Sequence, residues 1–248
     1  ELLAWKQERN GRVAMMIDGA RRIGKSYIAE EFAKQEYKSY ILVDFNNVDR
    51  NLMDIFENYL TNLDMFFSYL SLYYNVTLHE RASVIIFDEV QLYPKARAAI
   101  KYLVKDGRYD YIETGSLVSI NRNVKNIIIP SEEHRINMYP MDFEEFLIAN
   151  GIGEFVMQTM RMHFEKRQSL PDALHAKILD LFKKYLIVGG LPDAVNTFVE
   201  QRNVMAIRKI QEDIHALYAL DASKYEKEHA RLKIQRIYNL IPSNLENR

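Results

Sequence analysis

The sequence predicts an α/β fold in which a parallel sheet flanked by helices is followed by an all-helical subdomain. Up to about Pro140, short apolar runs alternate with segments of helical periodicity, and strands that alternate with helices form parallel sheets. Beyond Pro140 the pattern is helical only. We therefore expect a core domain over residues 1–140 and a helical lid or subdomain over residues 141–248, truncated before a further domain.

Five short apolar runs predict the strands of the sheet. They span residues 12–18, 39–45, 82–89, 109–116 and 135–140. The run at 82–89 is apolar on successive residues instead of alternating, which is typical of a strand buried on both faces.

Helical spacing of apolar residues predicts the remaining elements. In the first part these are a helix over residues 25–35, two helices between residues 48 and 74, and a helix over residues 94–104 that begins on proline. In the second part, Asp142 and Glu145 form a capping-box pattern at the start of a helix. Later breaks are expected at Pro171, Gly189-Gly190, Pro192, around Ala222 and at Pro242. The glycine pair would be either a hinge or an ordinary turn.

Composition limits the classes of function. Of the 248 residues, 48% are apolar, which allows a substantial buried core. A net charge of −1 argues for neither a polyanion nor an anionic membrane as the main partner. The absence of cysteine excludes disulfides and thiolate metal sites and fits a cytoplasmic protein. We expect no membrane span, since no apolar run approaches the ~20 residues that a bilayer requires.

The octapeptide "GARRIGKS", from Gly19 to Ser26, matches the Walker A pattern G-x-x-x-x-G-K-[ST]. Gly19 and Gly24 allow the tight turn that brings backbone N–H groups to phosphate oxygens. Lys25 would reach the β- and γ-phosphates, and the Ser26 hydroxyl would ligate Mg²⁺. A predicted strand precedes the motif and an amphipathic helix follows it, which is the required context. We assign nucleotide binding to Gly19, Arg22, Ile23, Gly24, Lys25, Ser26 and Tyr27.

Arg21 and Arg22 occupy the variable part of this loop. A guanidinium there could present paired N–H donors to a phosphate or to an acidic partner. Alternatively, both arginines are surface charges that pair with an acid such as Glu30.

Two acids, Asp88 and Glu89, close the predicted strand at 82–89 in the manner of a Walker B motif. Ligands of open α/β sheets bind at the carboxyl ends of the strands. Asp88 would hold Mg²⁺, and Glu89 would orient or deprotonate an attacking water. A hydrolase needs such a base, whereas a small-molecule kinase does not. The alternative is a pair of solvated charges.

Thr114 and Ser116 end the next predicted strand. If that strand lies beside the strand of the phosphate loop, Thr114 or Ser116 would face the γ-phosphate and the attacking water. Thr-Gly-Ser is also an ordinary turn sequence.

Five segments occur in the order "GARRIGKS", "IIFDEVQLYP", "YIETGS", "YPMDFEEFL" and "YLIVGGLPDAV". Together they resemble the prokaryotic archaeal-type predicted ATPases, AAA-related P-loop ATP-binding proteins with a C-terminal domain of unknown function. The resemblance covers nearly the whole chain, and Gln91 after the two acids is typical of it. His134-Arg135 departs from it, because members often have Gly-Arg at these positions.

This resemblance implies an AAA-like P-loop NTPase core with an added strand in the sheet. It implies ATP and Mg²⁺ at Lys25 and Ser26, a metal and water pair at Asp88 and Glu89, and a sensor within residues 114–116. Fuller members continue into a winged helix, through which DNA would be a partner. A homo-oligomer or a regulatory protein partner is also implied.

From these observations we expect an ATP hydrolase, dependent on magnesium, that couples hydrolysis to a conformational change of the helical part. The catalytic residues would be Lys25, Glu89 and Thr114, with Ser26 and Asp88 on the metal. The alternative is a nucleotide-gated binding module or DNA-associated regulator with little turnover.

Overall fold

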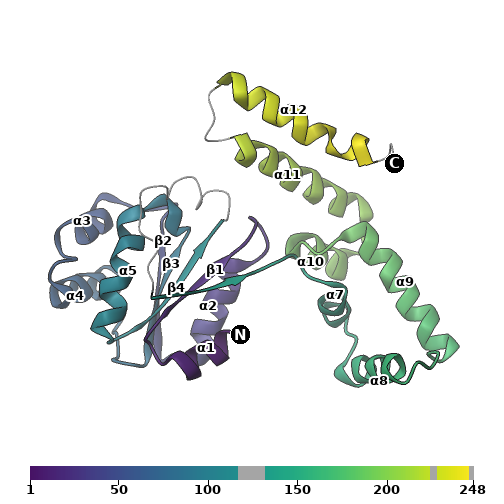
Figure 1. Ribbon diagram of the computed structural model, residues 1–248, viewed down its shortest axis with the longest axis horizontal. Coiled ribbons are helices and arrows are strands. Elements are labelled where there is room, and N and C mark those ends of the chain that lie inside the picture. Colours follow the sequence, from purple (N-terminus) through teal and green to yellow (C-terminus); the bar gives the residue numbers. More distant parts are fainter. Residues whose placement is uncertain (117–131, 224–227, 246–248) are drawn as a thin grey trace. The chain divides into compact units, whose positions relative to one another are not determined.

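The computed structural model describes residues 1–116, 132–223 and 228–245. It divides into two compact units, Glu1–Tyr139 and Pro140–Arg248 (Figure 1). The first unit contains the sheet, and the second is helical.

The first unit is built on a five-stranded sheet with the order β2-β3-β4-β1-β5. The strands are β1 (Ala14–Asp18), β2 (Ser39–Asp44), β3 (Ser83–Asp88), β4 (Asp110–Gly115) and β5 (Glu133–Asn137). Every neighbouring pair is parallel. The sheet places β4 between β1 and β3, which is the added-strand order that the family resemblance implies. The expected architecture, a parallel sheet flanked by helices and followed by a helical part, is confirmed.

Burial explains which strands the sequence predicted well. Every residue of β1, β3 and β4 is buried, and the apolar runs of β1 and β3 gave a clear signal. The edge strand β5 is different, since Glu133 and Arg135 replace apolar residues on one of its faces. The prediction for β5 was therefore wrong in its limits: it began two residues late and ran past Asn137.

Helices cover both faces of this sheet (Figure 1). The helices α1 (Leu2–Arg9) and α2 (Lys25–Glu36) lie on one face, while α3 (Arg50–Asn58), α4 (Leu63–Tyr74) and α5 (Pro94–Asp106) lie on the other. A short 3₁₀ turn, η1 (Val90–Leu92), joins β3 to α5. Alternation along β1 sends Met15 to the first face and Met16 to the second. On the first face α2 contributes Ala29 and Ala33, whose small side chains let the helix approach the sheet closely.

A buried ion pair fastens α5 to the sheet. Arg97 is fully buried, and its Nη2 donates to Glu133 Oε2 at 2.7 Å. Its Nη1 lies 3.8 Å from the sulfur of Met16 on β1. Arg135 also contacts Glu133, at 3.1 Å. Buried charges are tolerated only when they are paired, so this contact fixes α5 over β1 and β5.

The second unit consists of helices α7 to α12. They are α7 (Phe143–Ala149), α8 (Glu154–Glu165), α9 (Asp172–Val188), α10 (Pro192–Gln201), α11 (Val204–Ser223) and α12 (Glu228–Leu245). The capping box is confirmed, because Glu145 N–H donates to Asp142 Oδ1 at 2.8 Å and Asp142 N–H donates to Glu145 Oε2 at 2.9 Å. The predicted break at Pro242 is wrong, since α12 continues to Leu245. Proline removes one N–H from the helix, and here only the last turn is affected.

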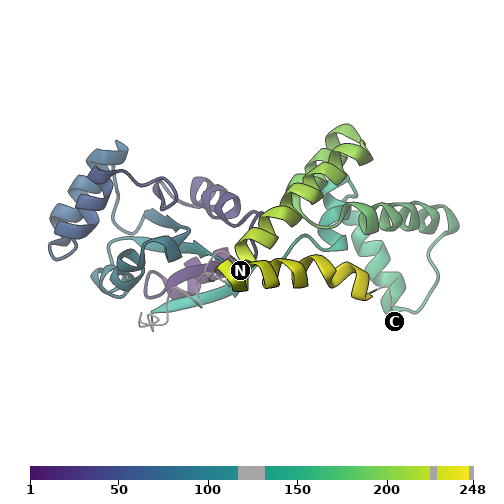
Figure 2. The same cartoon turned by 90° about the horizontal axis from the view of Figure 1, so that it is seen from above.

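In Figure 2 the helices of this unit run from teal-green (α7) to yellow (α12). The aromatic rings of His215 and Tyr238 lie 4.7 Å apart, between α11 and α12.

Among the described residues, no helix combines the length and the apolar character needed to cross a bilayer.

The glycine pair after α9 is a packed turn. Met141 N–H donates to Gly190 O at 2.8 Å, and the Tyr185 hydroxyl donates to Met141 O at 2.9 Å. A Cβ on Gly190 would lie 2.0 Å from that carbonyl oxygen. These contacts join the segment after Tyr139 to the end of α9, and they favour the turn interpretation over the hinge.

Replacing Arg97 with methionine should lower the free energy of unfolding of the first unit by about 3–5 kcal/mol, because Glu133 loses its closest buried partner. Chemical denaturation followed by the fluorescence of Trp5 measures this change. Trp5 is the single tryptophan and is buried in this unit.

The control is Lys95→Ala on the same helix, where an exposed pair with Glu57 at 3.4 Å is lost. We expect a change below about 0.5 kcal/mol for the control. A similarly small effect of Arg97→Met would show that the buried pair does not hold α5 in place.

Candidate nucleotide-binding site

The phosphate loop lies between β1 and α2. Gly24 caps α2 with a left-handed backbone (φ 94°) and has no side chain that could cap the helix. The backbone N–H groups at the start of α2, with the positive end of the helix dipole, favour an anion. The local fold therefore has the geometry that the Walker A pattern predicts.

Gly19 begins the loop where no larger residue fits. A Cβ at this position would lie 2.3 Å from the carbonyl oxygen of Met138 and 2.6 Å from Ile23 Cδ1. Met138 N–H in turn donates to Asp18 O at 2.7 Å. The loop thus packs directly on the chain that follows β5.

Lys25 is only 5% exposed, and its Nζ donates to Gly19 O at 3.1 Å and to Ala20 O at 2.7 Å. Burial lowers the pKa of Lys25, while the carboxylates of Glu89, Asp88 and Asp18 oppose that change. Lys25 is therefore a buried amine held within the loop, and the charges of the nearby acids favour its protonated form.

Asp88 is the point where three elements meet. Ser26 Oγ, on α2, donates to Asp88 Oδ1 at 2.6 Å, and the Thr114 hydroxyl, on β4, donates to the same oxygen. Glu89 N–H donates to Thr114 Oγ1 at 3.1 Å. One threonine hydroxyl therefore links both acids, and the parallel order of β1, β4 and β3 brings these groups to one edge of the sheet.

Glu89 follows β3 in a left-handed backbone conformation (φ 52°). This conformation costs a non-glycine residue about 1–2 kcal/mol. The Glu89 carboxylate accepts a hydrogen bond from Gln91 Nε2. The loop after β3 is thus held by contacts from both Thr114 and Gln91.

Two buried acids lie directly before residues of the site in the sequence. Asp18 precedes the phosphate loop and Glu113 precedes Thr114, and both are fully buried. Burial raises the pKa of Asp18, and Arg135 opposes this with Nη1 3.7 Å from Asp18 Oδ2. Burial also raises the pKa of Glu113 well above its usual value near 4.5; Arg97 opposes the rise and Glu133 adds to it.

Neither acid was singled out by the sequence reasoning. The signal that could have found them is a charged residue inside a run predicted to be a buried strand.

The structure brings together Lys25, Ser26, Asp88, Glu89 and Thr114, all predicted from the sequence. The other predicted residues lie around the loop with different exposures. The side chain of Ile23 is 1% exposed and packs into the core, Tyr27 is 68% exposed, Arg22 is exposed, and Ser116 is buried after β4.

The half-buried Arg21 is the loop arginine whose charge lowers the pKa of Lys25. Arg135 forms ion pairs with Glu133 and Asp18.

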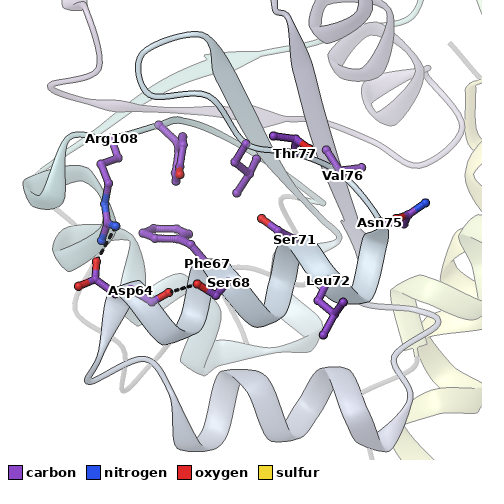
Figure 3. Close-up of a pocket in the computed structure, with 11 residues that line it drawn as sticks. Asp64, Phe67, Ser68, Ser71, Leu72, Asn75, Val76, Thr77 and Arg108 are labelled. Atoms are coloured by element: carbon purple, nitrogen blue, oxygen red, sulfur yellow. Dashed lines mark hydrogen bonds and ion pairs between the residues drawn. The ribbon is translucent and has the colours of Figure 1, made fainter.

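A separate cavity of about 620 Å³ lies beside α4 (Figure 3). Its lining includes Phe67 and Arg108, the latter just before β4, so it lies at the edge of the sheet opposite the phosphate loop. The Arg108 guanidinium contacts Asp64 at 2.7 Å (Figure 3). It also contacts Asp106 at 2.8 Å. This cavity is not part of the candidate site.

The strand order, the loop and the acids at the end of β3 define a P-loop nucleotide-binding domain of the ATPase type. Residues 11–147, more than half of the chain, match the family described as "AAA domain", and the chain belongs to this family. Residues 179–248 match a domain of unknown function.

The comparison with curated proteins found no match. Among solved structures, the chain is similar to the Aeropyrum pernix ORC1 protein in complex with DNA. The two are 12% identical over 98% of this chain and 76% of that one, with a TM-score of 0.42. The narrower resemblance to archaeal-type ATPases stays a prediction.

Glu113→Gln should change how stability depends on pH. A raised pKa in the folded protein stabilises it at low pH, and this contribution is lost as the pH rises above about 4.5 toward the folded pKa. Within that window the parent should lose up to about 1.4 kcal/mol per pH unit relative to the variant. Denaturation curves at several pH values, followed by Trp5 fluorescence, measure the difference. If the free energy of unfolding changed with pH in the same way in the parent and in Glu113→Gln, Glu113 would not be a titrating buried acid.

Proposed function

We propose that this protein is an ATPase, dependent on magnesium, that couples hydrolysis to a conformational change of its helical part. The observation that carries the proposal is the convergence of the Ser26 and Thr114 hydroxyls on Asp88 Oδ1, beside the buried Lys25. Such a group of a cation, a hydroxyl and a carboxylate at a helix N-terminus suits a nucleoside triphosphate and its metal.

The donor atoms fit Mg²⁺, which prefers hard oxygen ligands. Ser26 Oγ and Asp88 Oδ1 lie 2.6 Å apart, and these two groups would hold the ion. When bound, Mg²⁺ would neutralise charge on the β- and γ-phosphates.

Lys25 and Glu89 would supply the rest of the chemistry. The Lys25 ammonium now bonds to neutral carbonyl oxygens of the loop, and phosphate oxygens would be stronger, charge-assisted partners. Glu89 would orient a water and accept its proton as the water oxygen attacks the γ-phosphorus, with ADP as the leaving group. Through its hydroxyl, Thr114 would hold Asp88 and Glu89 in fixed positions relative to each other.

Coupling to the helical part is supported by Gly19. Its contact with Met138 leaves no room between the phosphate loop and the chain after β5. A loop that reshapes around phosphates would displace Met138, and the next residues, Tyr139 and Pro140, lead into the second unit. The path from the nucleotide to the second unit is therefore short and covalent.

Phosphate release measured with Mg²⁺-ATP and no acceptor tests the proposal. The parent should hydrolyse ATP, and Glu89→Gln should still bind ATP but lose about 100-fold or more in kcat, the contribution of a general base. Lys25→Ala should lose ATP binding, as measured by titration with a fluorescent nucleotide.

The matched control is Lys34→Ala on the same helix, whose amine pairs with Glu30 and Glu31. It should bind and hydrolyse like the parent. Tight ATP binding without hydrolysis by the parent would instead favour the nucleotide-gated binding module. Equal rates for the parent and Glu89→Gln would contradict the role given to Glu89.

A further inference from the structure

Gln91 is a buried amide beside the proposed base. It lies in η1, is 2% exposed, and its Nε2 donates to Glu89 Oε2. Its Oε1 is buried and has no hydrogen-bond partner among the described residues. Only the NH₂ group of an amide can donate to a carboxylate, so this contact fixes which end of the Gln91 side chain faces Glu89.

A buried amide oxygen without a partner is unfavourable for folding. A leucine at position 91 would have nearly the same size and would bury no polar atom. Stability alone therefore gives no reason for a glutamine at this position, and its contact with Glu89 is the interaction that a leucine would lose.

The same contact controls where the Glu89 side chain points. The Glu89 backbone is fixed by its N–H bond to Thr114 Oγ1 and by the turn that begins η1. Only the side-chain torsions of Glu89 are then free to change, and the hydrogen bond from Gln91 restrains them. The negative charge of Glu89 is also the first of the carboxylate charges that oppose the lowering of the Lys25 pKa.

We propose that Gln91 is a positioning residue that holds the Glu89 carboxylate in one orientation at the end of β3, where the attacking water would lie. This inference rests on the proposed ATPase function, because Gln91 acts only through Glu89. A base that is free to rotate spends less time in reach of the water, and small misplacements of a catalytic group reduce rates strongly.

The test compares kcat and KM for Mg²⁺-ATP in the parent, Gln91→Leu and Gln91→Glu. Leucine removes the donor, and glutamate keeps the shape but, when ionised, presents only acceptors to Glu89. Both variants should lower kcat by about 10- to 100-fold. KM should change less than about twofold, because the contacts of the phosphate loop are intact.

A double mutant separates positioning from packing. In the Glu89→Gln background, adding Gln91→Leu should lower the residual rate no further, because two residues that act as a unit are not additive. The matched control is Gln211→Leu in the second unit, where Nε2 donates to Ile187 O and Val188 O at 2.9 Å. This control should leave kcat unchanged.

Failure of the inference about Gln91 and failure of the proposed ATPase function give different results. If the parent hydrolyses ATP and both Gln91 variants keep its kcat, the inference is overturned and the proposed function stands. A further loss in the double mutant, or a KM that rises in step with the fall in kcat, would also overturn it by showing an effect outside Glu89. If the parent has no hydrolytic activity, the proposed function fails and the inference falls with it.

Discussion

The candidate site depends on one oxygen atom. Asp88 Oδ1 accepts hydrogen bonds from Ser26 on α2 and from Thr114 on β4, and the Thr114 hydroxyl also receives the N–H of Glu89. This arrangement exists only because β4 lies between β1 and β3, with the carboxyl ends of all three strands at one edge. A different strand order would leave the same residues in the chain but would separate the hydroxyls from the acid.

Beneath this edge, the sheet carries charge where most sheets carry apolar side chains. Asp18 and Glu113 are fully buried, and Arg97 and Arg135 reach them or their neighbour Glu133. Such charges stabilise a fold only as a connected set. The printed ion pairs join α5, β1 and β5, and the buried acids Asp18 and Glu113 directly precede two of the predicted site residues, Gly19 and Thr114.

The sequence predicted what is local. The Walker A loop, the acids after the buried run and the capping box at Asp142 are each encoded within a few residues. What it did not predict depends on strand register: the pairing of Arg97 with Glu133 joins residues 36 positions apart. The start of β5 was missed because Glu133 and Arg135 hide its periodicity. The contact of Gln91 with Glu89 spans two positions, yet it requires the left-handed turn at Glu89, which a glutamate does not signal.

The central claim is that a triphosphate and its metal occupy the space between the phosphate loop and the end of β3. The most direct measurement is a crystal structure with a non-hydrolysable ATP analogue and Mn²⁺ in place of Mg²⁺, with the metal located by anomalous scattering. The account predicts the metal peak within ligand distance of Ser26 Oγ, with Asp88 beside it, and Lys25 Nζ on a phosphate oxygen instead of the Gly19 and Ala20 carbonyls. A metal peak away from both residues, or a nucleotide outside the loop, would contradict it.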